Sequence, residues 1–154
     1  MPNFIPFDSD FETRIRASFE RQQVMVLLGA SLAKVLPGEV HIVLPYQPQL
    51  TQQHGYLHAG IITTIVDSAC GYAAYSLMSP DFSVLSVEFK MNLLSPARGD
   101  EFIGIGKVIK SGRTLTICSG EMHAVDKGET KLVALMQATM IAVQRGEIES
   151  DSAK

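Results

Sequence analysis

The segment 58–78 carries a single formal charge, Asp67, among apolar and small polar residues. An ionised carboxylate that leaves water without partners costs several kcal/mol, so folds keep one only where it is paired or useful. A long apolar segment must also be covered by other parts of the chain. The segment therefore predicts a long central helix in the core, and Asp67 is the first candidate for a functional residue.

The composition is that of one ordinary globular domain: 154 residues, 46% hydrophobic, 19% charged, net charge -3. No basic cluster is interleaved with aromatic residues, which argues against nucleic acid as a partner. The N-terminus lacks a signal-peptide pattern, and Thr, Ser and Gly interrupt the central segment, so we expect no membrane insertion and a cytoplasmic location. Cys70 and Cys118 lie in apolar segments without CxxC spacing and are expected to be reduced core thiols.

The N-terminal half predicts a helix followed by a hairpin. Residues 9–28 have helical periodicity, with Ser9 or Asp10 available as a cap and Gly29 as the end. The period then changes to two, which predicts strands 31–36 and 39–46 around a turn. The polar segment 47–57 has no periodicity and is expected to be a loop that leads into the central helix.

The C-terminal half predicts an antiparallel meander with strands at 83–94, 101–111, 114–125 and 130–143. We expect Gly112 and Gly128 to supply positive φ in the last two turns. The element order indicates an α+β fold in which a curved antiparallel sheet wraps around the long apolar central helix. A single domain over 1–145 would be followed by a polar, frayed tail at 146–154.

The two faces of the predicted central helix differ in size. At about 100° per residue, the side chains near Asp67 are small: Gly60, Thr63, Thr64, Cys70, Gly71 and Ala74. The opposite side carries bulkier residues that suit a sheet: Ile61, Ile62, Ile65, Ala69 and Tyr72. The small face allows a ligand or a second copy of the helix, related by a two-fold axis, to approach closely.

The segment from Gln52 to Gly60, followed by Asp67 nine residues after His58, resembles the pattern of hotdog-fold acyl-CoA thioesterases. The phenylacetyl-CoA thioesterase (PaaI-like) branch is the most similar, and the resemblance covers residues 20–143. It includes the segment 85–97 after the helix and the turn at 112–114. This chain departs from the pattern at Ala59, where the family usually has glycine, and at Gln52, where this branch more often has asparagine.

The resemblance implies that Asp67 is the catalytic carboxylate, either as general base on a water or as nucleophile through an anhydride. The alternative is a buried Asp bonded to backbone or Thr. The N–H groups of Ala59 and Gly60 would bind the thioester oxygen as negative charge develops on it. Ordinary helix initiation has the same sequence signature.

Three further residues take roles by resemblance. Gln52 would hold the water or the substrate carbonyl, since an amide both donates and accepts; the alternative is a solvated loop glutamine. His58 would order the loop and the helix start by hydrogen bonding. Ser86 would bond the water or the carboxylate, although a strand serine is ordinarily just a small polar residue.

Four basic residues are candidates for the phosphates of CoA, with Arg113 favoured by its turn position: Lys90, Arg98, Lys110 and Arg113. Solvated surface charge is the alternative for each of them. The histidines make no metal-ligand pattern with any acid, so no metal is predicted. No separate cofactor is expected, because CoA is part of the substrate.

The sequence thus predicts an acyl-CoA thioesterase that hydrolyses a thioester to a carboxylic acid and free CoA. By resemblance it would be a homodimer or a homotetramer, with Gln52, His58 and the amides of one subunit facing Asp67 and Ser86 of another. A non-catalytic acyl-CoA binding or sensing hotdog protein is the alternative. A hotdog hydratase is a third possibility, which would need a histidine acting with a carboxylate across a different loop.

Overall fold

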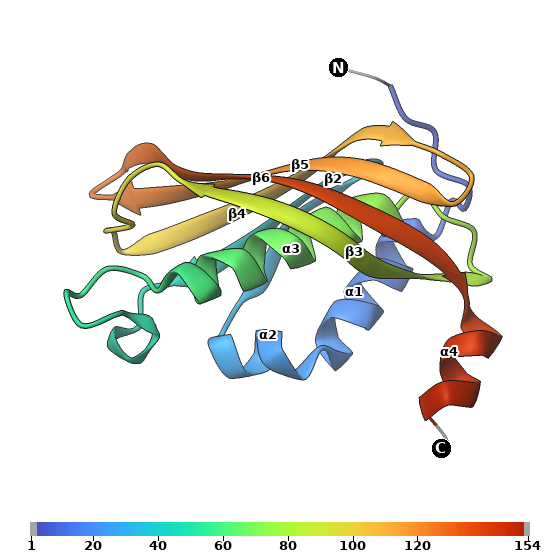
Figure 1. Cartoon of the computed structure of the whole chain (residues 1–154), viewed down its shortest axis with the longest axis horizontal. Coiled ribbons are helices and arrows are strands. Elements are labelled where there is room, and N and C mark those ends of the chain that lie inside the picture. The colour runs from blue at the N-terminus through green and yellow to red at the C-terminus, as the bar shows by residue number, and fades with distance from the viewer. Residues whose placement is uncertain (1–2, 153–154) are drawn as a thin grey trace.

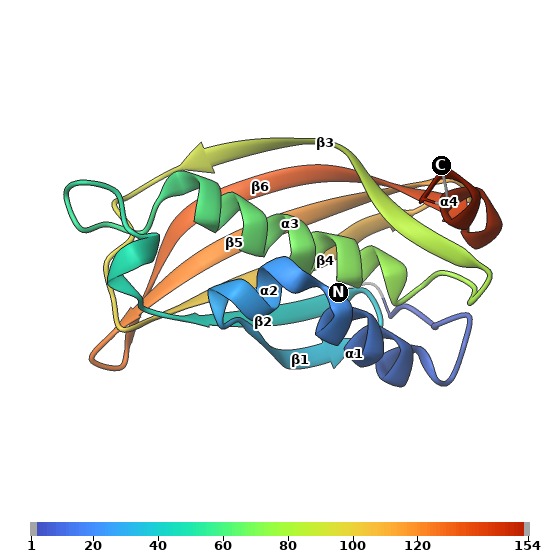
Figure 2. The same cartoon turned by 90° about the horizontal axis from the view of Figure 1, so that it is seen from below.

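A six-stranded antiparallel sheet curves around one long helix in the computed structural model, which describes residues 3–152 (Figures 1 and 2). The strands lie in the order β1 (Ser31–Leu36), β2 (Glu39–Pro45), β4 (Glu101–Ser111), β5 (Leu115–Asp126), β6 (Glu129–Gln144) and β3 (Phe82–Leu93). Helix α3 (Ala59–Tyr75) crosses the concave face. The predicted α+β hotdog fold is confirmed.

Strand β3 does not lie where a simple meander would place it. Strands β4, β5 and β6 pair in succession, whereas β3 pairs only with β6 and ends the sheet. The chain enters α3 after β2 and leaves it at the opposite side of the sheet, so the helix carries it across the concave face. The predicted meander was wrong at this strand, and one edge of β3 lacks a partner strand among residues 3–152.

The predicted N-terminal helix is two helices, α1 (Phe11–Arg21) and α2 (Gln23–Leu28). Gln22 between them is extended, with φ -77° and ψ 95°. This turn keeps apolar residues of both helices in the core: Ile15, Phe19, Met25 and Leu28. Asp10 occupies the cap position without a side-chain cap bond, and Gly29 ends α2 with φ 68°, as predicted.

The two predicted glycine turns differ. In the β5–β6 turn, Lys127 and Gly128 both have positive φ, 50° and 83°, which is the two-residue turn that matches strand twist. The turn between β4 and β5 needs no positive φ at Gly112, where the N–H donates to the Leu115 carbonyl at 2.9 Å. The prediction was therefore wrong for Gly112 and right for Gly128.

The polar C-terminal segment is helical rather than frayed, because α4 covers Arg145–Ser152 (Figure 1). Residues 153–154 of the predicted tail lie outside the described residues. The loop before α3 contains a short 3-10 helix, η1 (Pro48–Leu50). None of the helices within residues 3–152 combines the length and apolar character that crossing a membrane requires.

Glycines on the sheet let α3 approach closely. A Cβ at Gly106 would lie 2.3 Å from the Ala69 carbonyl carbon and oxygen on α3. Cβ atoms at Gly104 and Gly120 would come within 2.6 Å and 2.4 Å of side-chain carbons of the same helix. The position of α3, and of the groups that it carries, thus depends on the absence of side chains here.

Gly106→Ala is expected to lower the free energy of unfolding by about 1–3 kcal/mol or more, because the new methyl group meets helix backbone that cannot rotate away. Gly71→Ala is the matched control. Its Cβ would meet nothing within 4 Å, so the helix should gain about 0.5–1 kcal/mol. Thermal unfolding of both variants measures the two opposite shifts, and an unchanged Tm for Gly106→Ala would contradict this account of the packing.

Candidate active site

The face of α3 that carries Asp67 is not covered by the sheet. Its small residues are partly or fully exposed: Gly60, Thr63, Thr64 and Gly71. Asp67 is half-buried on this face and lines a cavity of about 360 Å³. The prediction that it lies inside the apolar core was therefore wrong. Cys70 and Ala74 were expected on the open face but are buried, since the curved sheet reaches further around the helix.

Ser86 of β3 is bonded to the Asp67 carboxylate. Its hydroxyl donates to Asp67 Oδ1 at 2.7 Å, and the register of β3 shifts directly after it, between Ser86 and Glu88. Such bulges redirect side chains at the edges of sheets. Burial raises the pKa of Asp67, and the Ser86 hydrogen bond lowers it in part. A carboxylate with a raised pKa is a stronger base than an ordinary surface aspartate.

His58 caps the start of α3 with its side chain. Its Nδ1 accepts from the Gly60 N–H at 2.9 Å, so the imidazole carries its proton on Nε2 in this arrangement. The Gly60 amide is therefore engaged, whereas the Ala59 N–H donates to no other described residue. Within residues 3–152, the Gly60 amide has a partner and the Ala59 amide has none, so one of the two predicted oxyanion donors is available at the positive end of the helix dipole.

Gln52 is held within the turn that precedes α3. The Oε1 atom of its side chain accepts from the backbone N–H of His54. The backbone N–H of Gln52 donates to the Tyr56 carbonyl at 2.9 Å. The side-chain acceptor is thus occupied, while Nε2 donates to no other described residue. What remains available to a ligand is a hydrogen-bond donor.

These residues form two separate groups in one chain: a helix-entry group (Gln52, His58 and Ala59) and a carboxylate group (Asp67 and Ser86). From Ala59 to Asp67 the helix rises about 12 Å along its axis. Reacting groups must lie within about 3–3.5 Å of one another. The cavity at Asp67 includes Ser86 but no residue of the helix-entry group, so a single chain does not assemble all of them around one thioester.

The four basic candidates do not gather at one place. The Arg98 guanidinium lies 5.4 Å from the centre of the Tyr56 ring, beside the helix-entry group. Arg113 and Lys110 lie at the β4–β5 turn, and Lys90 lies on β3. All four are exposed, and none belongs to an ion pair among residues 3–152. Their contact with CoA phosphates stays a prediction.

The sequence did not indicate the distant end of the cavity. Its walls there include Tyr75 of α3 and Arg145 of α4. The spacing of Asp67, Gly71 and Tyr75, four residues apart, was a signal for Tyr75, since such residues share a helix face. No local pattern pointed to Arg145, which comes 78 residues after Asp67 in the sequence.

Comparisons with known proteins show the family to which the chain belongs. A family model described as Thioesterase superfamily matches residues 54–131. Acyl-coenzyme A thioesterase 13 of Mus musculus is 30% identical over 112 residues, 71% of this chain and 76% of that protein.

A thioesterase family protein from Silicibacter pomeroyi is 49% identical with a TM-score of 0.86, over 87% of this chain and 98% of that chain. The E. coli PaaI protein of the phenylacetic acid degradation operon shares the fold, with 19% identity and a TM-score of 0.77 over 87% and 94% of the two chains. This chain therefore belongs to the thioesterase superfamily, as a hotdog-fold thioester hydrolase.

Proposed function

We propose that the protein hydrolyses an acyl-CoA thioester to a carboxylic acid and free CoA, at sites that two copies of the chain build together. The observation that carries this proposal is the division of the site residues into two groups about 12 Å apart along α3. The similarity to a protein named acyl-coenzyme A thioesterase supports the substrate class.

The free edge of β3 supports the pairing of two copies. Large apolar side chains are exposed along it: Leu85, Val87, Phe89 and Leu93. Long apolar edge strands are templates for pairing with another strand. Pairing of β3 with its copy about a two-fold axis would continue the sheet and set the two α3 helices antiparallel. The helix-entry group of each copy would then face the carboxylate group of the other.

In such a site the thioester oxygen would accept from the Ala59 N–H, where the helix dipole also favours negative charge. The Gln52 Nε2 would donate to the carbonyl or to the attacking water. Asp67 would take a proton from that water while the water oxygen forms a bond to the carbonyl carbon of the thioester. The C–S bond then breaks, and the proton passes to the sulfur of CoA. Direct attack by the carboxylate, through an anhydride that water opens, uses the same contacts.

Ser86→Ala is expected to move the acid limb of the kcat/KM profile to higher pH. The hydroxyl stabilises the ionised carboxylate, so its removal raises the pKa of Asp67 further. The base is then protonated, and inactive, over a wider range of acid pH. A pH profile with an acyl-CoA measures the shift, and Ser111→Ala is the control because this exposed serine at the end of β4 lies outside the cavity and makes no bond to Asp67. An acid limb at the wild-type pH would exclude this role for Ser86.

The proposed function is tested by a hydrolysis screen with free-thiol detection. The panel holds short, medium, long and aromatic acyl-CoAs, and S-acyl derivatives of a small thiol as controls without the CoA phosphates. We expect turnover of at least one acyl-CoA, with a kcat/KM above that for the same acyl group on the small thiol. Binding without turnover across the panel would replace the proposal with the non-catalytic alternative.

A further inference from the structure

The cavity beside Asp67 leads away from the carboxylate to a polar end. It passes between α1, α3 and the start of β3 and reaches α4. Polar and charged groups make up much of its wall: Ser18, Arg21, Gln22, Ser68, Ser83, Arg145 and Glu149. Val84 and Ile148 are the aliphatic members. A cavity for a plain alkyl chain would be lined mostly by apolar groups.

The axis of the cavity follows one face of α3. Asp67, Gly71 and Tyr75 all line it, and their spacing of four residues places them one above the other. Tyr75 lies about 12 Å from Asp67 along the helix. An acyl group whose carbonyl is next to Asp67 can therefore extend along this face, past the open space at Gly71, toward Tyr75.

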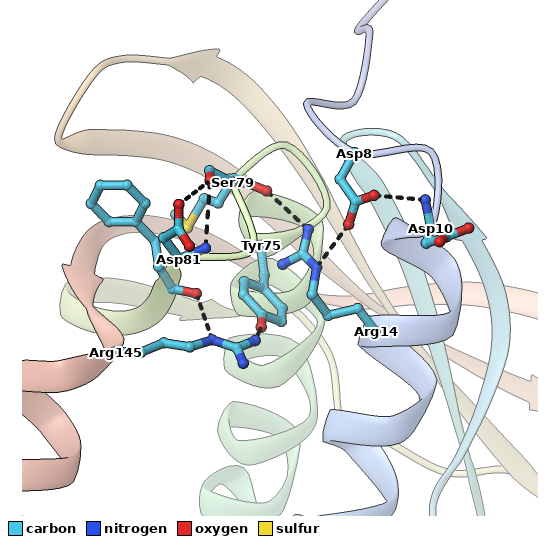
Figure 3. Close-up of polar contacts among 9 residues, drawn as sticks. Asp8, Asp10, Arg14, Tyr75, Ser79, Asp81 and Arg145 are labelled. Atoms are coloured by element: carbon cyan, nitrogen blue, oxygen red, sulfur yellow. Dashed lines mark hydrogen bonds and ion pairs between the residues drawn. The ribbon is translucent and has the colours of Figure 1, made fainter.

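Arg145 stands at the distant end, and its side-chain partners among residues 3–152 are neutral. Its Nη2 donates to the Tyr75 hydroxyl at 2.5 Å and its Nε to the Phe82 carbonyl at 3.4 Å (Figure 3). Nη1 donates to no other described residue, and no ion pair among residues 3–152 includes Arg145. A half-buried guanidinium without a carboxylate is costly, and an anionic ligand would offset that cost.

Tyr75 fixes the guanidinium and is itself fixed from the other side. The Arg14 guanidinium lies 4.3 Å from the centre of its ring, and Arg14 is held by the Met78 carbonyl at 2.9 Å and by Asp8 at 3.4 Å (Figure 3). Tyr75 is 5% exposed, so its hydroxyl has little freedom to leave Arg145. The donors at this end are held in place before any ligand arrives.

We propose that the cavity is the acyl pocket and that it selects acyl groups with a terminal carboxylate, which Arg145 and the Tyr75 hydroxyl bind. The proposal rests on the proposed function and names its substrate class. Two cations, Arg21 and Arg145, face two anions, Asp67 and Glu149, in the wall. Asp67 is at the opposite end and Glu149 is exposed on α4, whereas the Arg145 guanidinium is half-buried and bonded to the Tyr75 hydroxyl, where the acyl group ends.

A plain alkyl end would be rejected at this position. It would remove water from the guanidinium and the hydroxyl without replacing their hydrogen bonds, which is the arrangement that gives strong discrimination between substrates. The binding of an arginine to a carboxylate is also the charge-assisted pair with the best matched geometry.

The test compares acyl-CoAs of equal length: glutaryl, adipoyl and suberoyl against pentanoyl, hexanoyl and octanoyl. For at least one length, we expect kcat/KM to be about tenfold or more higher for the carboxylate form. Arg145→Gln should lower this ratio by about tenfold or more. Arg16→Gln is the matched control, since Arg16 is an exposed residue of α1 paired with Glu12 outside the cavity, and its ratio should equal that of wild type.

Two other variants keep the test sharp if Arg145→Gln does not fold. Tyr75→Phe should lower the ratio, whereas Glu149→Gln should raise it by removing a like charge from the pocket wall. Alkyl thioesters hydrolysed as well as their carboxylate partners, or a ratio insensitive to all three changes, would overturn this inference alone. No hydrolysis of either series would overturn the proposed function together with it.

Discussion

Asp67→Asn is expected to lower kcat for acyl-CoA hydrolysis by about 10³-fold or more. The amide keeps the size of the side chain and can accept from the Ser86 hydroxyl, but it can neither take a proton from water nor attack a carbonyl. KM should change little, because the carboxylate acts on the reacting atoms. Asp126→Asn, at an exposed end of β5, is the control and should retain wild-type turnover.

The same substitution should leave the fold intact and raise its stability at neutral pH. Burial raises the pKa of Asp67 above its unfolded value, so the native state binds the proton more tightly than the unfolded state. The wild-type protein therefore loses stability as the pH rises from the pKa of Asp67 in the unfolded state through its higher pKa in the native state. The new side chain of the Asp67→Asn variant is neutral like a protonated Asp67, so the variant keeps its stability over this pH range. Denaturant unfolding at acid and neutral pH measures the difference, and near-normal hydrolysis by a folded variant would exclude Asp67 as base or nucleophile.

Much of the fold was predictable, because its elements follow local periodicity. The strand pattern at 101–111 and the turn at Gly128 depend on neighbours in sequence alone, and both agree with the structure. The partner of β3 depends on how the chain crosses the sheet, which no local pattern contains. The extended backbone at Gln22 was missed for a similar reason, since the buried residues on both sides still fit one helical period.

The geometry of the candidate site was predictable where a motif places its residues near one another in sequence, whereas the roles of these residues stay predictions. The spacing between His58 and Asp67 predicted that His58 lies at the start of the central helix and Asp67 further along it. Ser86 was predicted by the family resemblance. The hydrogen bond from the Gly60 N–H to His58 agrees with the predicted role of His58 in ordering the helix start. That this bond occupies one of the two predicted oxyanion donors was not foreseen, because a capping histidine and a free one look alike in sequence. Arg145 begins α4, directly after the last strand, and meets Tyr75 only through the tertiary fold.

Ala59→Pro is expected to lower kcat by about 10²–10³-fold, because it removes the free N–H at the start of α3. Ala59 is the first residue of the helix, where proline is well tolerated. The residue before a proline must be extended, and His58 already is, with φ -64° and ψ 138°. Ala59→Gly retains the N–H and should keep wild-type kcat. Equal activity of the two variants would exclude the Ala59 amide as the oxyanion donor.

Mixing the Ala59→Pro and Asp67→Asn chains should restore activity that neither has alone. If each site takes its amide from one copy and its carboxylate from another, random assembly leaves about a quarter of the sites with both groups intact. The mixture should therefore approach a quarter of wild-type kcat per site. If one chain supplied both groups, every site would carry a defect. Subunit exchange is verified by mass spectrometry of differently tagged chains, and hydrolysis that stays at the level of the single variants after exchange would show that the sites are not shared.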